Sequence, residues 1–420
     1  MHRLWRILGD NRDLRLLLAA NLISLTGDWI LRTGLAYQVY ALTGSTLASA
    51  GSVLASLLPQ IVLGSVAGVY ADRWDRRASM VTTNLLMLLA LLPLLVVQQA
   101  GQIWLVYLVI GMQACLAPFF ASAEAALVPS LVPHQHLVTV NSLNAQAGDV
   151  ARLVGAALGG FVAGVGGITL LGLVNMVTFA VAATLLWLLR APRTAGAARP
   201  ATATREWAEG IGVAWSSRPL RVFLTFTVIT GVGEATMGTL IAPFVRDVLG
   251  GDARAFGLIM AAQAVGGLVG GLVATLVAHR FAPRAMFGWG AVIFGALDLV
   301  LFLYPLVTDV LWPAPVLIAV VGLPVAFLTA GGMTIFQNAT HDDHRGRVFG
   351  ATAAAGGAAM LIGTLAAGVL AERVGIVPVI ATQGAAYCLA GLVVLVALVD
   401  PAPVREEPAP ALAVPNHRAG

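Results

Sequence analysis

The stretch LRLLLAANLISLTGDW at residues 14–29 returns in altered form as LRVFLTFTVITGVGEA at residues 220–235. Both copies open with Leu-Arg, and Asp28 of the first copy aligns with Glu234 of the second, 206 positions later. Two further matches keep nearly this offset, ADRWDRRA with AHRFAPRA and GAALGGFVAGVGGI with GTLAAGVLAERVGI. Three matches in the same order predict a chain built from two repeated halves.

The composition indicates a protein that lies in a membrane. Of its 420 residues, 59% are hydrophobic and only 10% are charged, whereas soluble domains carry roughly 25% charged residues. Apolar runs of about 20 residues, the length that a helix needs to cross a bilayer, recur along the whole chain. We therefore expect an all-α membrane protein. The runs predict twelve transmembrane spans: 14–38, 47–71, 79–98, 102–127, 139–164, 167–190, 220–245, 254–280, 283–306, 312–339, 346–372 and 375–399.

These spans divide into two six-helix bundles related by pseudo-symmetry. We expect one bundle at residues 1–190, a cytoplasmic linker at 191–219, a second bundle at 220–400 and a disordered cytoplasmic tail at 401–420. Within the linker, Trp207, Ile211 and Trp215 recur at helical spacing, which is typical of a short amphipathic helix on the inner leaflet. A plain linker is the alternative.

Arginine placement predicts the orientation in the membrane. All 24 basic residues are arginines, and 19 of them fall in the amino terminus, the loops after even-numbered spans, or the carboxyl tail. Because short cytoplasmic segments are enriched in basic residues, both termini are expected to be cytoplasmic. Three arginines fall on the opposite side: Arg246, Arg254 and Arg373.

The loop after the second predicted span reads GVYADRWDRRASM at residues 68–80 and resembles the signature of the major facilitator superfamily, Gly-x-x-x-Asp-Arg-x-Gly-Arg-Arg. Asp75 stands where the signature has its second glycine. The matching residues are Gly68, Asp72, Arg73, Arg76 and Arg77.

More of the chain is similar to the twelve-helix drug:proton antiporters of that superfamily, the branch of macrolide efflux pumps and enterobactin-type exporters. The similar stretches include Ser-x-x-Gly-Asp at residues 24–28, Leu-Thr-Gly-Ser at 42–45, LVPHQHLVTVNSLNAQAGDVARLVGAALGG at 131–160 and HRGRVFG at 344–350. The resemblance covers essentially the whole transmembrane region. It implies the major facilitator fold, in which a central site opens alternately to either side of the membrane.

The resemblance also implies a role for the signature loop as a latch between the halves. Asp72 would face the positive amino-terminal end of the eleventh span, near Arg345 and Arg347, and hold the inner side shut. The alternative is that these charges only anchor the topology of the chain.

Charged residues inside predicted spans point to a pathway, because an ionised side chain at mid-bilayer costs at least ~2.5–3.5 kcal/mol. Asp28 and Arg32 lie four apart on one helix face and can pair. Glu234 has no such neighbour, since the position that repeats Arg32 is a glycine. We therefore predict Glu234 as the principal proton carrier and the Asp28–Arg32 pair as its charge-switching partner.

Asp149 and Arg152, three apart in the fifth span, can form a similar pair and are further candidates for proton coupling. For both pairs the alternative is a static ion pair that holds helices in register. Asp298 lies in the ninth span, and a structural role is expected for it.

Polar side chains in the spans could line a substrate cavity. For the amides the alternative is an interhelical hydrogen bond, and a residue such as Glu124 could be merely solvated. The candidates are Gln113, Glu124, Asn144, Gln146, Gln263, Gln337 and Asn338.

Together these features predict a secondary active transporter of the bacterial inner membrane that exports amphipathic small molecules, such as drugs, against proton entry. The alternatives are a dedicated exporter of a siderophore or lipid-like metabolite, and a membrane sensor that does not transport. We expect a monomer whose partners are the lipid bilayer, the substrate and protons, with no nucleic acid, no metal site and no cofactor beyond the proton as coupling ion. No motif of an intramembrane enzyme is found in the sequence.

If the latch operates, Asp72→Asn should loosen the inner gate. A charge at a helix terminus is worth about 0.3–1 kcal/mol, so the closed state should lose about two- to fivefold in population. Transport and the labelling of an inner-gate cysteine by a membrane-impermeant reagent would measure this. If both stay unchanged, the loop has only its topological role.

Overall fold

The computed structural model describes residues 11–71, 75–190, 215, 217–340 and 342–398, without the side chains of 61–71, 134, 138 and 342–347. The described chain is helical and contains no strand, which confirms the expected all-α class. The long helices of the first half are α2 (Arg12–Thr43), α3 (Thr46–Ala71), α4 (Arg76–Ala90), α5 (Ile103–Leu131) and α6 (Leu137–Trp187). Those of the second half are α8 (Arg218–Pro243), α9 (Ala253–Val277), α10 (Pro283–Leu303), α11 (Pro313–Ala339), α12 (Asp342–Val374) and α14 (Thr382–Ala397).

Short helical turns extend or join the long helices. The π-helix η4 (Phe244–Val248) continues α8, and α13 (Ile376–Ile380) lies between α12 and α14. The remaining turns are the 3-10 helices η1 (Leu92–Val96), η2 (Ala100–Gln102), η3 (His134–His136), η5 (Ala278–Arg280) and η6 (Tyr304–Leu306).

Ten segments of the described residues are long and apolar enough to cross a membrane, so the chain is a multi-pass membrane protein. The predicted count of twelve is not confirmed, because α3 is not among the ten and α6 is one of them although it covers two predicted spans. A helix of 51 residues would be about 75 Å long, more than twice the hydrocarbon thickness. At Gly167 the backbone leaves the helical region (φ 57°, ψ −150°), where only glycine is readily accommodated, and the chain reverses there.

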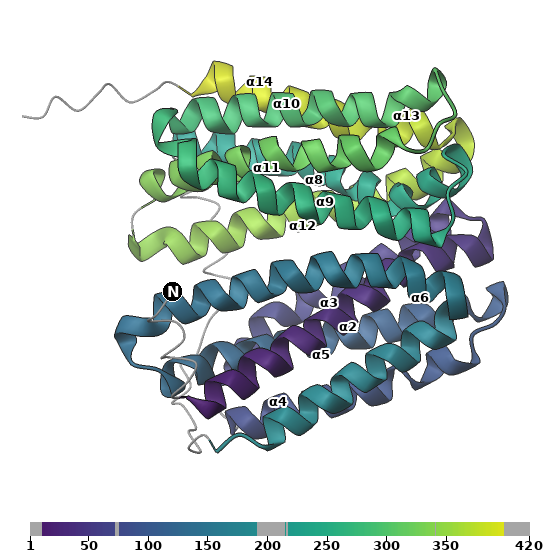
Figure 1. The fold of residues 1–420 in the computed structure, drawn as a ribbon. Helices are drawn as coiled ribbons and strands as arrows, with labels where there is room; N and C mark the ends of the chain where they lie inside the picture. Colours follow the sequence, from purple (N-terminus) through teal and green to yellow (C-terminus); the bar gives the residue numbers. More distant parts are fainter. Residues whose placement is uncertain (1–10, 72–74, 191–214, 216, 341, 399–420) are drawn as a thin grey trace, which may run out of the picture.

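The two halves form two groups of helices that converge toward one end of the molecule (Figure 1). We call this end the sealed end and define it by residues 37–47, 160–164, 246–257 and 368–372. The other end, where α6 and α8 are joined through residues 191–217, we call the linker end. The predicted linker helix around Trp207 and the tail at 401–420 lie outside the described residues, and the division into domains stays a prediction.

Two glycine contacts join the halves at the sealed end. A Cβ atom on Gly160 of α6 would lie 2.6 Å from the Cα atom of Gly257 on α9. A Cβ atom on Gly368 of α12 would lie 2.8 Å from the Cβ atom of Ala50 on α3. Gly160 and Gly368 are 208 positions apart, and Ala50 and Gly257 are 207 apart, so the two contacts follow the repeat in the sequence.

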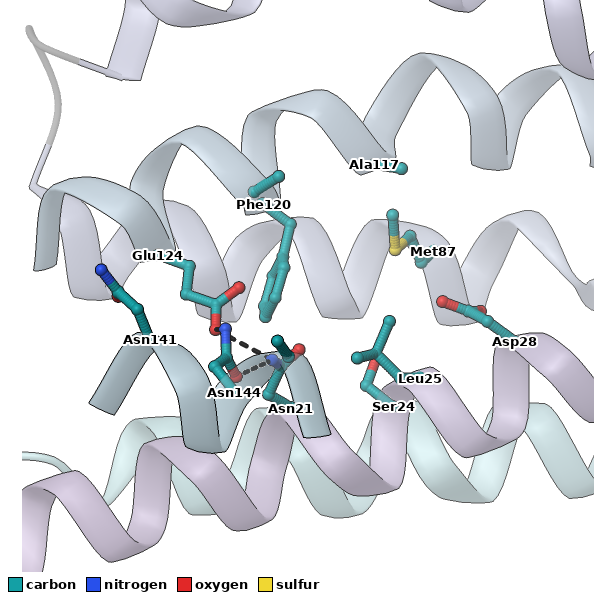
Figure 2. Close-up of a pocket in the computed structure, with 12 residues that line it drawn as sticks. Asn21, Ser24, Leu25, Asp28, Met87, Ala117, Phe120, Glu124, Asn141 and Asn144 are labelled. Atoms are coloured by element: carbon teal, nitrogen blue, oxygen red, sulfur yellow. Dashed lines mark hydrogen bonds between the residues drawn. The ribbon is translucent and has the colours of Figure 1, made fainter. Parts of the chain in front are cut away.

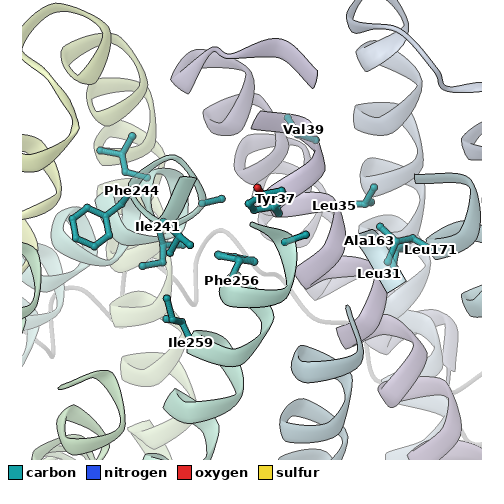
Figure 3. Packing of buried hydrophobic residues seen from close by; sticks show 14 of the residues in the cluster. Leu31, Leu35, Tyr37, Val39, Ala163, Leu171, Ile241, Phe244, Phe256 and Ile259 are labelled. Atoms are coloured by element: carbon teal, nitrogen blue, oxygen red, sulfur yellow. The ribbon is translucent and has the colours of Figure 1, made fainter. Parts of the chain in front are cut away.

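Buried apolar side chains of both halves pack together at this end, among them Tyr37, Ile241 and Phe256 (Figure 3). Tyr37 of α2 lies against Phe256 of α9, with ring centroids 5.9 Å apart, and one buried cluster contains residues of both halves. Since glycines let the backbones approach closely, the halves meet here through van der Waals packing.

Gly160→Ala should open the sealed end, because the new methyl group has no room unless α6 and α9 separate. Overpacking of this kind costs about 1–3 kcal/mol, so the sealed population should fall about fivefold or more. The distance between spin labels at Gln98 and Asp309, which lie in exposed loops of the two halves, would report the change. Gly148→Ala on the same helix is the control, since a Cβ atom there meets nothing within 4 Å. Identical distance distributions for both variants would contradict the assigned contact.

Candidate functional site

A cavity of about 450 Å³ lies among α2, α4, α5 and α6 of the first half (Figure 2). Its wall is mainly apolar, with side chains such as Leu25, Met87 and Phe120, and it carries two carboxyl groups, Asp28 and Glu124. The cavity therefore offers an apolar surface with a few polar groups, which is the usual composition of a small-molecule site.

Glu124 is held by amide groups from two other helices. Asn21 of α2 donates to Glu124 Oε1 at 2.9 Å, and Asn144 of α6 donates to the same atom at 3.0 Å. Asn21 also donates to Asn144 Oδ1 at 2.6 Å, so the three side chains form a closed network (Figure 2). Glu124 and Asn144, both predicted cavity residues, thus lie in the cavity wall, and the carboxyl group of Glu124 is not merely solvated.

Asp28 does not pair with Arg32 in this structure, contrary to the expectation from their spacing. Its Oδ1 atom accepts a hydrogen bond of 3.3 Å from Asn175, whose Oδ1 atom accepts one from Thr178. The guanidinium of Arg32 lies 5.2 Å from the ring centre of Trp29, and the described residues hold no Asp28–Arg32 ion pair within 4 Å. Arg32 thus makes a cation–π contact with Trp29, one turn earlier in the helix, instead of an ion pair with Asp28.

The second predicted pair is formed. Arg152 Nη2 lies 3.6 Å from Asp149 Oδ1, and both side chains are nearly half exposed. A Cβ atom on Gly267 of α9 would lie 3.3 Å from Arg152 Nη2, so this arginine lies between the two halves. An ion pair this exposed contributes about 0–1 kcal/mol, which leaves Arg152 able to change partners.

Glu234 occupies in α8 the position that Asp28 has in α2. The hydroxyl group of Tyr387 on α14 donates to Glu234 Oε1 at 2.5 Å. The described structure shows no ion pair to Glu234, in agreement with the absence of a cation at its repeat position. Phe226 and Phe294 lie against the Tyr387 ring, with centroids 6.1 Å and 4.3 Å away.

The repeat extends to the surroundings of these two acids. A Cβ atom on Gly27 would meet Asn175 and Thr178, and one on Gly233 would meet Gln383 and Ala386. Asn175 and Gln383 are 208 positions apart, and so are Thr178 and Ala386. This is close to the offset of 206 between the two glycines. Asp28 and Glu234 are therefore equivalent residues of the two bundles.

The other predicted cavity residues are not part of this network. Gln113 donates to the backbone oxygen of Met87 at 2.9 Å and so joins α5 to α4, as its alternative interpretation expected. None of Gln146, Gln263, Gln337 and Asn338 lines the described cavity.

The latch prediction cannot be followed in the described structure, because Asp72 and Arg73 lie outside the described residues and the burial of Gly68 and the side chains of Arg345 and Arg347 are not described. The two described arginines of the signature bind within the first half. Arg76 donates to the backbone oxygen of Ala126 at 2.7 Å, and Arg77 donates to that of Trp187.

A set of polar contacts at the sealed end was not predicted. Arg246 donates to the backbone oxygen of Tyr40 at 3.0 Å, and the hydroxyl group of Tyr40 donates to Asp247. Ser45 donates to Glu372 Oε1 at 2.7 Å. Each contact joins the two halves. One signal in the sequence could have indicated these contacts. Arg246 lies on the side of the membrane where the positive-inside pattern predicts few arginines, and the topology does not explain its position there.

Known proteins with a similar sequence are transporters by name. Residues 10–416 match the model of a family, MFS_3, described as transmembrane secretion effector. The chain is 26% identical over 398 residues to YfiS, an uncharacterized MFS-type transporter of Bacillus subtilis (strain 168), with 92% of this chain and 93% of that protein covered. It is 22% identical over 363 residues to macrolide efflux protein A of Streptococcus pyogenes, with 85% and 89% covered.

Solved structures share the fold at lower sequence identity. A bacterial homologue of the iron transporter ferroportin in an inward-facing state has a TM-score of 0.76 at 17% identity, with 92% of this chain and 98% of that chain covered. A D-xylose-proton symporter has a TM-score of 0.68 at 16% identity, with the same coverage.

Tyr40→Phe should weaken the sealed end, because Asp247 then loses a hydrogen bond that joins the halves. Hydrogen bonds to charged groups contribute about 1.5–3 kcal/mol, so the sealed population should fall about tenfold or more. Spin labels at Gln98 and Asp309 would again measure the separation. Tyr107→Phe is the matched control, since the Tyr107 hydroxyl group donates to Ala48 within the first half. An equal response of the two variants would count against a gate at Tyr40.

Proposed function

We propose that this chain, which belongs to the major facilitator superfamily as a transmembrane secretion effector, exports amphipathic small molecules in exchange for protons. The observation that carries the proposal is the equivalent placement of Asp28 and Glu234, one acid in each bundle, on membrane-spanning helices. Each is held by a neutral hydrogen-bond donor, so each can gain or lose a proton without breaking an ion pair seen in the described structure.

The transport cycle would use both ends of the molecule. Contacts between the halves concentrate at the sealed end, and this state would receive substrate through the linker end, which we propose to be cytoplasmic. Rocking of the bundles would break the contacts of Tyr40 and Gly160 and open the opposite side. Twelve spans, with α3 crossing the membrane once and α6 crossing it twice, would place both termini on the cytoplasmic side of the bacterial inner membrane.

The cavity chemistry favours a neutral or cationic amphipathic substrate. Its wall is mainly apolar, and the charged side chains that line it, Asp28 and Glu124, are both acids. The similarity to macrolide efflux protein A supports a substrate of the antibiotic type. An anionic siderophore would require cations in the wall, and Arg32 lies instead against Trp29.

Protonation would act as the switch. A neutral acid lies at lower free energy in a hydrocarbon surrounding than a charged one, so proton binding at Asp28 or Glu234 favours the state in which that acid is dry. Deprotonation favours the state that gives the carboxylate water or a cation, such as Arg32 or a cationic substrate. Because protons enter the cell down their gradient, the exchange would run in the direction that exports the substrate.

Asp28→Asn and Glu234→Gln should each lower gradient-driven efflux at least about tenfold, since a fixed neutral group cannot exchange a proton and ~1.4 kcal/mol corresponds to tenfold. Efflux of a macrolide from cells and its uptake into inverted vesicles under an imposed pH gradient would measure the effect. Asp309→Asn, in an exposed loop, is the control.

Normal pumping with unchanged pH dependence in both variants would exclude these acids as proton carriers. Binding of the macrolide without gradient-driven accumulation by the intact protein would instead favour a sensor that does not transport.

A further inference from the structure

A second acid lies near Glu234 in the second half. Asp298 of α10 is 1% exposed, and its Oδ2 atom has no hydrogen-bond partner among the described residues. Asp298 is close enough to Glu234, Tyr387 and Cys388 to interact with each of them electrostatically. The expected structural role would require a partner for this carboxyl group, and the described structure supplies none for Oδ2.

An amide group beside these acids is also unsatisfied. Gln383 of α14 is fully buried, and within the described part of the chain neither its Oε1 nor its Nε2 atom has a partner. It lies four residues before Tyr387, on the same face of α14, and its Cα atom is next to the backbone of Gly233. Buried polar groups are nearly always hydrogen-bonded, so the unpaired amide of Gln383 is available as a donor and acceptor for the acids beside it.

The first half explains why the amide is orphaned. There Asn175 donates to Asp28 and accepts from Thr178, so both of its amide atoms are used. In the second half the equivalent of Thr178 is Ala386, which offers no hydroxyl group. The donor to the acid is now Tyr387, at the position of Phe179, and Gln383 is left without either contact.

The second acid is likewise specific to the second half. At the offset of 207 that relates the signature loops, Asp298 corresponds to Leu91, which is fully buried in the first half. A carboxyl group thus stands at an apolar position of the repeat.

The surrounding helices provide no opposing charge in the described structure. α3, α11, α13 and α14 contain no charged residue. Arg284 of α10 donates to the backbone oxygen of Leu395 near the linker end, and α8 carries Arg218 and Arg221 in its first turn. On α12, Glu372 and Arg373 lie in the last turn, at the sealed end. Across the interface, α2 carries Asp28 and Arg32 within its span. Two ionised carboxylates would therefore be buried without compensation.

We propose that Glu234 and Asp298 bind protons as one coupled unit, with Tyr387 and Gln383 as its hydrogen-bonding groups. Burying one uncompensated charge is costly and burying two close together is more so, so the unit holds at least one proton in the sealed state. This deepens, and for its role in coupling rests on, the proposed proton-driven export. The unit gives the second half a proton store that the first half lacks.

Infrared absorption of the purified full-length protein in lipid nanodiscs tests the proposal without any substrate. The carbonyl stretching band of protonated carboxyl groups is recorded at pH 7 for the intact protein, Glu234→Gln, Asp298→Leu and the double variant. Asp298→Leu restores the residue of the first half and so limits the risk of misfolding. Asp28→Asn is the control for the first half.

We expect the double variant to lose a band that the Asp28→Asn variant keeps. Because the charge of one acid changes the protonation of the other in a coupled unit, the losses in the single variants should not add up to that of the double variant, and strictly additive losses would show that the two acids titrate independently. Equal bands in the intact protein and the double variant would show that the unit is ionised and would overturn the proposal. Loss of the band in sodium but not in potassium buffer would also overturn it, since the unit would then bind a metal cation. The infrared measurements do not depend on transport. The efflux experiment can therefore contradict the proposed export while the infrared result still supports the coupled unit.

Discussion

The structure depends on how carboxyl groups are accommodated within membrane-spanning helices. Three of these acids accept a hydrogen bond from another helix: Glu124 from Asn21 and Asn144, Glu234 from Tyr387, and Asp28 from Asn175, whereas Asp298 has no partner for Oδ2 among the described residues. These hydrogen bonds join α2, α5 and α6 in one bundle and α8 with α14 in the other. Since an unsatisfied polar group in hydrocarbon costs several kcal/mol, these hydrogen bonds also fix the packing inside each bundle.

Between the bundles the physical situation is different. The contacts at the sealed end consist of glycine packing at Gly160 and Gly368, of apolar packing such as that of Tyr37 on Phe256, and of a few polar contacts, such as that of Ser45 with Glu372. Each is expected to contribute only about 1–3 kcal/mol, so such contacts can be made and broken during a transport cycle. Rigid bundles joined by a weak interface are what alternation between two states requires, because a small free-energy difference can then shift the population.

The all-α class, the apolar runs and the repeat could be predicted from the sequence, because hydropathy and offset are properties of the chain itself, whereas the count of twelve spans is not confirmed. Partners of the buried acids were harder to foresee, since Asn175 lies 147 residues from Asp28 and Tyr387 lies 153 residues from Glu234. The spacing of Asp28 and Arg32 allowed an ion pair, but Trp29, three residues before Arg32, competes for the same guanidinium. An alignment of the two halves that pairs Asn175 with Gln383 would have indicated where the hydrogen-bond partners of Asp28 and Glu234 lie.

Duplication followed by divergence explains why the halves would differ in task. The first half has a cavity with Asp28 and Glu124 at its wall, and both amide atoms of its Asn175 are paired, which would suit contact with a bound molecule. In the second half, Tyr387 stands at the repeat position of Phe179, and Asp298 stands at that of the buried Leu91. These substitutions add titratable groups and no lining for a cavity. Proton binding at Glu234 and Asp298 in the second half, as proposed, could affect the cavity of the first half only through the interface, so the contacts at the sealed end would transmit part of the free energy of the gradient.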